Sequence, residues 1–423
     1  MTVIRTTSDA DVVVARLRAL LTGSRGVAYV AVPLLVAALV WSFVRLHGYQ
    51  LDLDIYRIGV QTWLAGGDMY GTLRPPMQGP VLPYIYPVFA AIVMVPLAVI
   101  PYTAALVLLF VLSLLALAGS IYLTVRVAWP AGGRNGALSV SMLALTAALI
   151  IEPVAQTFAF GQVNLVLMAM VLVDCLAPRT RWPRGLMIGL AAAVKLTPAG
   201  FVLFFLVRRD LRSTVVAAVT GVVATGIGFA VDPDASARYW FGGPAAGVSG
   251  STFFSNETIQ AILARQDLTG LPFTLLWLAG VVLILVLAYP VIRRAEPATA
   301  LAATAAVILM ASPTSWSHHW VWVVPALVAV GAHAVRYRSW AWAALGVVTA
   351  AVFYVAPFRW MPNVWGMTMR WSVFEQVLGA SYVIVATVSV ALGWWYFRRG
   401  PGAIGWRSAV PGRDGTATVA HGG

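Results

Sequence analysis

The chain has 423 residues, of which 60% are hydrophobic and only 10% are charged. A soluble domain carries about 25% charged residues, so this composition excludes a water-facing globule and predicts a membrane protein. The net charge of +13 does not indicate nucleic-acid binding, because the arginines lie in short clusters between apolar runs, as topology signals do. The single cysteine, Cys175, excludes an internal disulfide framework.

Apolar runs near 20 residues long recur along the chain, and they are continuous rather than alternating, which favours helices over a β-barrel. Two further segments, 86–101 and 185–207, are interrupted by prolines. The sequence therefore predicts an all-α, polytopic membrane protein of about 11–13 helices. The regular runs lie near residues 27–46, 103–125, 137–151, 163–177, 213–231, 272–292, 298–311, 319–335, 338–356 and 373–397.

The arginine clusters predict the orientation. Arginine-rich turns at 179–184, 208–212, 293–294, 336–338 and 398–399 belong in the cytoplasm by the positive-inside rule, as does the basic N-terminus. Two of these turns flank 185–207, so that segment is expected to enter the membrane and return, turning at Lys195–Pro198. Placing Arg126 and Arg134 inside as well makes 86–101 a half-helix or a re-entrant piece.

This topology predicts one transmembrane domain, residues 27–399, in the plasma membrane. A cytoplasmic segment, 1–26, precedes it and a disordered, Gly-rich cytoplasmic tail, 400–423, follows it. Five loops then face outward, and the two long ones are expected to carry short interfacial helices. The outer loops are 47–86, 152–162, 232–271, 312–318 and 357–372.

Carboxylate and amide side chains lie where two of these outer segments meet an apolar span. Asp52 and Asp54 directly follow the first span. Partial desolvation at the lipid–water boundary raises the pKa of a carboxyl group towards that of a general base, although each aspartate can equally be a solvated loop charge. Gln162 and Asn164 begin an apolar span, where their amides can bind sugar hydroxyls or simply cap the helix.

Lys195 is the only lysine among 28 basic residues and lies in an apolar run, where a cation is costly and usually functional. Pro198 breaks the helix beside it, which favours a phosphate contact over a snorkelling side chain. His318 and His319 lie at the outer boundary, where they can meet a phosphate, move a proton or merely join an aromatic belt. No Cys or Glu stands nearby at ligand spacing, so no metal is predicted.

These segments all fall on one side of the membrane. Together they offer a base, amides, a cation and imidazoles among many aromatic rings, a combination suited to a sugar carried on a phosphorylated lipid. An ion pump is disfavoured because no chain of acids crosses the spans. A secondary transporter, and a flippase or scaffold without catalysis, are the alternatives from other functional classes.

In their order along the chain, the motifs resemble glycosyltransferase family 87, the polyprenyl-phosphate-mannose-dependent mannosyltransferases of the GT-C membrane fold. The resemblance spans residues 50–320. It departs from the family pattern at Glu257, where an amide is expected. The motifs that carry it are Asp52-Leu-Asp54-Ile-Tyr56, Gly66-Gly67-Asp68-Met69-Tyr70, Gly161-Gln162-Val-Asn164, Lys195-Leu-Thr-Pro198, Asn256-Glu257-Thr258 and Ser312-Pro-Thr-Ser-Trp316-Ser-His318-His319.

The resemblance implies an inverting mannosyltransferase at the outer membrane face. Its donor is then polyprenyl-phosphate-mannose, its acceptor a phosphatidylinositol mannoside, and its product α-1,2-linked. Membrane lipids are the remaining partners, and no cofactor is implied because side chains can neutralise a monophosphate. Another sugar, such as arabinofuranose, or another acceptor stays open.

The resemblance also implies roles for individual residues. Asp54 is the first choice for the base on the acceptor hydroxyl, with Asp52 second. Lys195 and His318 are candidates to meet the charge of the leaving phosphate. The remaining predicted substrate contacts are Tyr56, Gln162, Asn164, Asn256, Glu257, Trp316 and His319.

Overall fold

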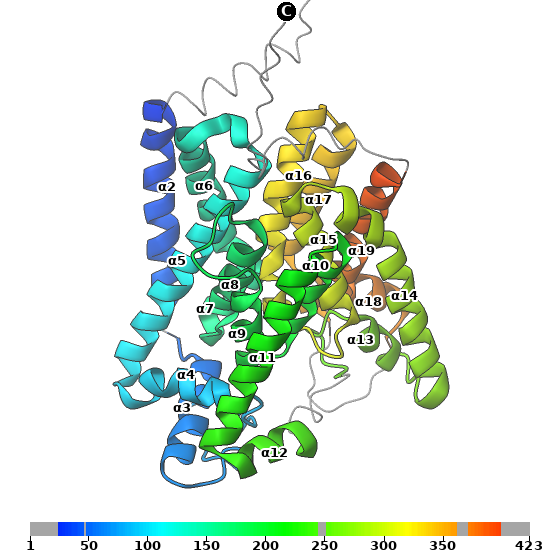
Figure 1. Cartoon of the computed structure of the whole chain (residues 1–423). Coiled ribbons are helices and arrows are strands. Elements are labelled where there is room, and N and C mark those ends of the chain that lie inside the picture. Colours follow the sequence, from blue (N-terminus) through cyan, green and yellow to red (C-terminus); the bar gives the residue numbers. More distant parts are fainter. Residues whose placement is uncertain (1–23, 46–47, 244–250, 362–370, 399–423) are drawn as a thin grey trace, which may run out of the picture.

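The computed structural model describes residues 24–45, 48–243, 251–361 and 371–398 (Figure 1). Within these residues the fold is built from α-helices and short 3-10 turns, and the extended pairing is a single isolated bridge between Asn256 and Trp316. The all-α prediction is therefore confirmed. The predicted terminal segments lie largely outside the described residues.

Many of the helices follow one another with short connections, and the long connection of residues 65–87 lies on the side of the molecule drawn at the bottom of Figure 1. They are α2 (Ser24–Arg45), α3 (Leu51–Leu64), α4 (Val88–Val99), α5 (Tyr102–Ala128), α6 (Gly133–Ile150), α7 (Glu152–Phe160), α8 (Asn164–Leu176), α9 (Leu186–Val194), α10 (Val202–Arg208), α11 (Leu211–Val231), α12 (Pro233–Gly242), α13 (Ile259–Ala264), α14 (Gly270–Arg294), α15 (Pro297–Ala311), α16 (Val323–Tyr337), α17 (Trp340–Val355), α18 (Val373–Gly379) and α19 (Ser381–Phe397). The 3-10 turns are η1 (Pro130–Gly132), η2 (Thr197–Phe201), η4 (Ser317–Trp322) and η5 (Pro357–Trp360).

Only some of the apolar helices are long enough to cross a bilayer. Among the described residues six helical segments are long and apolar enough, and the pair α18–α19, bent by 71°, makes up to seven. Five shorter apolar helices accompany them. A helix of 12 residues such as α4 is about 18 Å long, well short of the roughly 30 Å hydrocarbon core. The chain is a multi-pass membrane protein in which several helices stop at intermediate depth.

The segment 185–207 enters and returns, as predicted. Gly185 begins α9 so close to α11 that an added Cβ would lie 2.1 Å from the Ser213 carbonyl oxygen, and Gly189 meets α11 with similar closeness. Ser213 also lies just beyond the end of α10, so both ends of the segment meet at one side. Small residues thus let α9 and α11 pack backbone to backbone, as membrane helices commonly do.

The arginine-bearing turns lie together at that same side. Arg208 of α10 donates to the Ile292 carbonyl of α14 at 3.0 Å. Arg294 of α14 donates to the Phe397 carbonyl of α19 at 2.8 Å. The helix ends that carry the predicted cytoplasmic arginines therefore form one face of the molecule, at the end opposite to α3, α4 and α12 in Figure 1.

Short helices cover the opposite end, as predicted for the long loops. Trp63 of α3 donates to Asp232, the N-cap of α12, at 2.8 Å. Arg57 of α3 donates to the carbonyl oxygens of Leu97 and, at 2.8 Å, of Ile100, which tie α3 to the end of α4. Segment 86–101 thus stays on this side as a half-helix before α5 crosses, in agreement with the sequence.

Three reversals of the chain meet between these two ends. The α7–α8 corner, the α9–η2 break and the α15–η4 corner each end a helix, and the elements that they join contact one another. They contribute Asn164, Lys195 and His319, and the Lys195 ammonium is hydrogen-bonded to each of the other two. The candidate site lies at this junction.

Candidate active site

Helix α3 points its two aspartates to opposite sides. Residues two positions apart on a helix are separated by about 200°. The Asp52 carboxylate accepts a hydrogen bond from Gln162 Nε2 at 2.6 Å. The Asp54 carboxylate instead accepts from the Tyr49 hydroxyl at 2.5 Å and from the Met77 backbone N–H at 3.3 Å. Asp52 therefore faces the junction, while Asp54 fastens the loop beside α3.

The Gln162 amide is held in one orientation. Gly161 ends α7 in the left-handed conformation (φ 68°), and an added Cβ there would lie 2.7 Å from Leu53 Cβ, so α7 can turn against α3 only with glycine. The Tyr56 hydroxyl donates to Gln162 Oε1 at 2.6 Å, and Tyr86 lies 3.1 Å from the Tyr56 hydroxyl. Gln162 must therefore turn its NH₂ group to Asp52.

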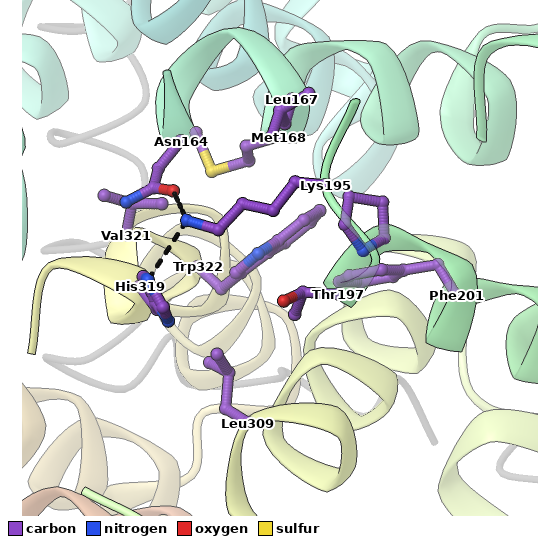
Figure 2. Close-up of a pocket in the computed structure, with 11 residues that line it drawn as sticks. Asn164, Leu167, Met168, Lys195, Thr197, Phe201, Leu309, His319, Val321 and Trp322 are labelled. Atoms are coloured by element: carbon purple, nitrogen blue, oxygen red, sulfur yellow. Dashed lines mark hydrogen bonds between the residues drawn. The ribbon is translucent and has the colours of Figure 1, made fainter. Parts of the chain in front are cut away.

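Lys195 projects from the end of α9 into a cavity (Figure 2). Its Nζ donates to Asn164 Oδ1 at 3.0 Å and lies 3.1 Å from His319 Nε2. An ammonium has only donors, so His319 Nε2 accepts and its proton lies on Nδ1 when the imidazole is neutral. The Tyr86 ring is 5.8 Å from Nζ, within cation–π range.

His318 is turned differently from His319. Its backbone carbonyl accepts from Asn164 Nδ2 at 3.0 Å and from the Thr157 hydroxyl at 3.2 Å. Its ring packs edge-on against Phe160. Within the described residues the buried Nε2 of His318 and Nδ1 of His319 have no hydrogen-bond partner, so both imidazoles keep a polar atom available.

The cavity at Lys195 has one polar side and an apolar remainder. Asn164, Lys195, Thr197 and His319 supply the polar atoms, and aromatic and aliphatic side chains of η2, α8, α15 and η4 close the rest (Figure 2). A cation in such surroundings is stabilised by an anionic ligand. The arrangement suits a phosphate that is attached to an apolar group.

A second, apolar groove begins one residue away. Leu196 lines it together with small residues on the facing sides of α9 and α11, including Gly189, Ala218 and Gly221. Trp240 and the exposed Phe241 of α12 also line this open groove, whose volume is about 650 Å³. Consecutive residues at the break after α9 thus line the cationic cavity (Lys195) and the apolar groove (Leu196).

Asp52 has the acidity of a base that works near neutral pH. Burial raises the pKa of its carboxyl group to about 6, while the Gln162 hydrogen bond and the Lys195 charge act in the opposite direction. A carboxylate with this pKa is ionised at neutral pH and can still take up a proton during reaction.

Three predicted substrate contacts support the site from behind. Asn256 Oδ1 accepts from the Ser315 N–H at 2.9 Å, and the Glu257 N–H donates to the Ser315 carbonyl at 2.9 Å. Glu257 is fully buried near Arg265, and Trp316 packs edge-on against Phe253. None of the three lines the Lys195 cavity, so the structure places them as a frame for the histidine segment.

Two residues of the site, Tyr86 and Glu152, were not predicted from the sequence. Tyr86 covers Lys195 and contacts Tyr56, but one tyrosine in an aromatic loop carries no distinctive pattern. Glu152 is buried behind the histidines and bonded to Ser317. An isolated acid between two apolar runs was the available signal. In the described part of the chain, no group of three or more His, Cys, Asp or Glu side chains could hold a metal ion.

Comparison with known proteins identifies the family. The model of glycosyltransferase family 87 matches residues 84–313, more than half of the chain. This chain belongs to glycosyltransferase family 87. The family predicted from the sequence motifs is therefore confirmed.

Two curated relatives of this family 87 glycosyltransferase are similar over most of its length. Both are named polyprenol-phosphate-mannose-dependent α-(1-2)-phosphatidylinositol mannoside mannosyltransferase. The Mycolicibacterium smegmatis protein is 36% identical over 392 residues, 86% of each chain. The Mycobacterium tuberculosis protein is 38% identical over 359 residues, 80% of this chain and 84% of the relative. A solved structure, ArnT from Cupriavidus metallidurans bound to undecaprenyl phosphate, aligns at 16% identity with a TM-score of 0.43, covering 88% of this chain and 78% of ArnT.

The charge arrangement around Asp52 predicts its titration. Lys195→Met removes a positive charge and Gln162→Leu removes a donor to the carboxylate, so each variant should raise the pKa of Asp52 above about 6. Infrared difference spectroscopy of the ¹³C-labelled aspartates, with Asp52→Asn to assign the band, measures this value. Arg238→Met, which removes the partner of the remote Asp68, should leave it unchanged. An unshifted band in both variants would contradict the described contacts.

Proposed function

We propose that this glycosyltransferase is an inverting mannosyltransferase. It transfers mannose from polyprenyl-phosphate-mannose to a phosphatidylinositol mannoside, in α-1,2 linkage, at the outer membrane face. The observation that carries the proposal is that the Asp52 carboxylate, oriented by Gln162, lies within range of the charge of Lys195, which lines a cavity together with His319. The two mycobacterial relatives, whose names state the same donor, acceptor class and linkage, support it. Membership of a glycosyltransferase family favours transfer over transport.

Single displacement assigns the two ends of the site different tasks. Asp52 takes the proton of the acceptor hydroxyl as its oxygen attacks the anomeric carbon. The bond from that carbon to the phosphate oxygen breaks, and polyprenyl phosphate leaves with the electron pair. Lys195 and His319 face the phosphate and meet its charge, so that neither a general acid nor a metal is required.

Geometry favours Asp52 over Asp54 as the base. The Asp52 carboxylate accepts a hydrogen bond from Gln162 at the α7–α8 corner, and the Lys195 charge lowers its pKa. Asp54 is buried, and its carboxylate is taken up by Tyr49 and the backbone of Met77. We therefore give Asp54 a structural role in the loop after α3, and His318 the place of a neighbour to the phosphate-facing His319.

The apolar groove provides a path for the donor tail. It opens beside the cation that meets the phosphate, and its lining of small residues leaves room for an isoprenoid chain. A phosphate at Lys195 with its chain in the groove lined by α9 and α11 would place the donor across the break at Lys195–Leu196. The acceptor headgroup then approaches from the side of α3.

The two aspartates should differ in transfer assays. Asp52→Asn should lower mannosyl transfer by at least about 100-fold, because it removes the base. Asp54→Asn should lower it less than about tenfold while reducing thermal stability, because it weakens two hydrogen bonds to a charged group. Purified protein, polyprenyl-phosphate-mannose and mass spectrometry of the product measure both. The reverse ranking, at equal folded fraction, would exclude Asp52 as the base.

Filling the groove should weaken donor use. Ala218→Trp places a large ring among the groove-lining residues of α11 and should raise the KM for polyprenyl-phosphate-mannose about tenfold or more. Val219→Trp is the matched control, since Val219 is exposed but does not line the groove. A short-chain donor analogue should be affected least. Equal KM values for both variants would place the tail elsewhere.

Cysteine labelling tests the outer face. In a Cys175→Ala background, Asp234→Cys on α12 should react with a membrane-impermeant maleimide in intact cells. Arg336→Cys, at the arginine-bearing end of α16, should react only after permeabilisation. Both side chains are exposed. The opposite pattern would put the site on the cytoplasmic face.

A further inference from the structure

Behind the histidine segment lies a carboxyl group that does not touch the cavity. Glu152, the first residue of α7, is only 4% exposed. Its Oε1 accepts from the Ser317 hydroxyl at 2.8 Å, and its Oε2 accepts from the Tyr382 hydroxyl at 2.8 Å. Both carboxylate oxygens thus join α7 to other parts of the fold.

One of the two partners is fixed by its own packing. The Tyr382 ring is fully buried and stacks on Phe353, with ring centroids 3.8 Å apart and planes 18° apart. The Trp320 and Phe358 rings also contact it. Tyr382 therefore offers Glu152 a rigid support, from which the carboxylate reaches Ser317.

Ser317 is the residue immediately before the two histidines. The next carbonyl, that of His318, is held by Thr157 of α7 and by Asn164 of α8. Helix α7 thus binds the start of η4 at two consecutive residues: Glu152 binds Ser317, and Thr157 binds the His318 carbonyl. These two hydrogen bonds fix the start of η4, and they therefore fix the position of His319 Nε2 relative to Lys195 Nζ.

The charges around Glu152 determine how it titrates. Burial raises the pKa of its carboxyl group to about 7, while the Ser317 and Tyr382 hydroxyls and the Arg359 charge oppose this rise. Glu257 is the other acid nearby, itself faced by Arg265. Only the carboxylate form can accept from both hydroxyls at full strength, because protonation turns one oxygen into a donor.

We propose that Glu152 is a positioning residue for the donor phosphate site. Its carboxylate is held by the Tyr382 hydroxyl and binds the Ser317 hydroxyl, and it thereby positions His318 and His319 to receive the donor phosphate. This inference rests on the proposed function, since it assigns the histidine segment to polyprenyl phosphate. Glu152 acts through Ser317 and touches neither substrate.

Three variants test the link: Glu152→Gln, Ser317→Ala and the double variant. Each single variant should raise the Kd for polyprenyl phosphate about tenfold and lower transfer about 10- to 100-fold, since each removes a hydrogen bond to a charged group. The double variant should be no worse than the poorer single one, because both remove the same link. The control is Asp174→Asn. Asp174 is a buried acid that accepts from the Ile188 N–H of α9, and its replacement should leave the Kd within about twofold.

A pH profile separates positioning from a merely structural role. Glu152→Gln resembles the protonated enzyme at all pH values. The ratio of wild-type to Glu152→Gln transfer rate should therefore be large above pH 7 and approach one as pH falls well below about 7. Asp52 titrates in both proteins and cancels in the ratio. A ratio that does not change with pH would overturn the proposal.

The outcomes distinguish the two proposals. Wild-type protein that neither binds polyprenyl phosphate nor transfers mannose contradicts the proposed function. If the wild-type protein does both, two results contradict only the role of Glu152. One is an unchanged Kd in the single variants, and the other is a double variant whose loss of affinity is the sum of the two single losses. Thermal midpoints are measured for every variant, and Ser317→Ala, which truncates one hydroxyl, keeps the test decisive if Glu152→Gln fails to fold.

Discussion

A lysine ammonium inside an apolar bundle is the constraint on which this structure depends. Removing a cation from water is costly unless polar partners replace the water. Lys195 finds Asn164 Oδ1 and His319 Nε2, each about 3 Å away, and the face of Tyr86. These hydrogen-bonding partners are neutral, and the Asp52 carboxylate is close enough to act on the Lys195 charge without being hydrogen-bonded to it. In the proposed function, the donor phosphate is the ligand that completes the set.

Meeting this demand explains why so many helices stop inside the bundle. Asn164 is the first residue of α8, and Lys195 directly follows α9. His319 lies in the short turn η4, so all three residues are at or beside a break between helices. The breaks that shorten these helices below the thickness of a bilayer are the same breaks that bring the polar ends together. Gly161 lets α7 turn against α3, and Gly185 lets α9 begin directly against α11.

The sequence predicted the fold class well because its signals are local. Apolar runs, Pro198 and the arginine turns define helices, a break and a common face without reference to distant residues. The pairing of Asp52 with Gln162 is different, because which face of α3 turns inward depends on a contact 110 positions along the chain. Spacing alone therefore could not choose between Asp52 and Asp54.

The same limit explains the residues placed at the back of the site. Asn256 and Glu257 look like ligand contacts in a polar loop, yet they bond to the backbone of Ser315. Glu152 resembles any loop acid until Ser317 and Tyr382 are brought to it from far along the chain. Residues that orient other residues are recognised only once the tertiary contacts are known.

A structure of the protein determined by electron cryomicroscopy with bound polyprenyl phosphate tests the central claim most directly. The phosphate should lie within hydrogen-bond distance of Lys195 Nζ and His319, with the first isoprene units entering the groove between α9 and α11. A phosphate bound at the arginine-bearing face, with the Lys195 cavity empty, would contradict it.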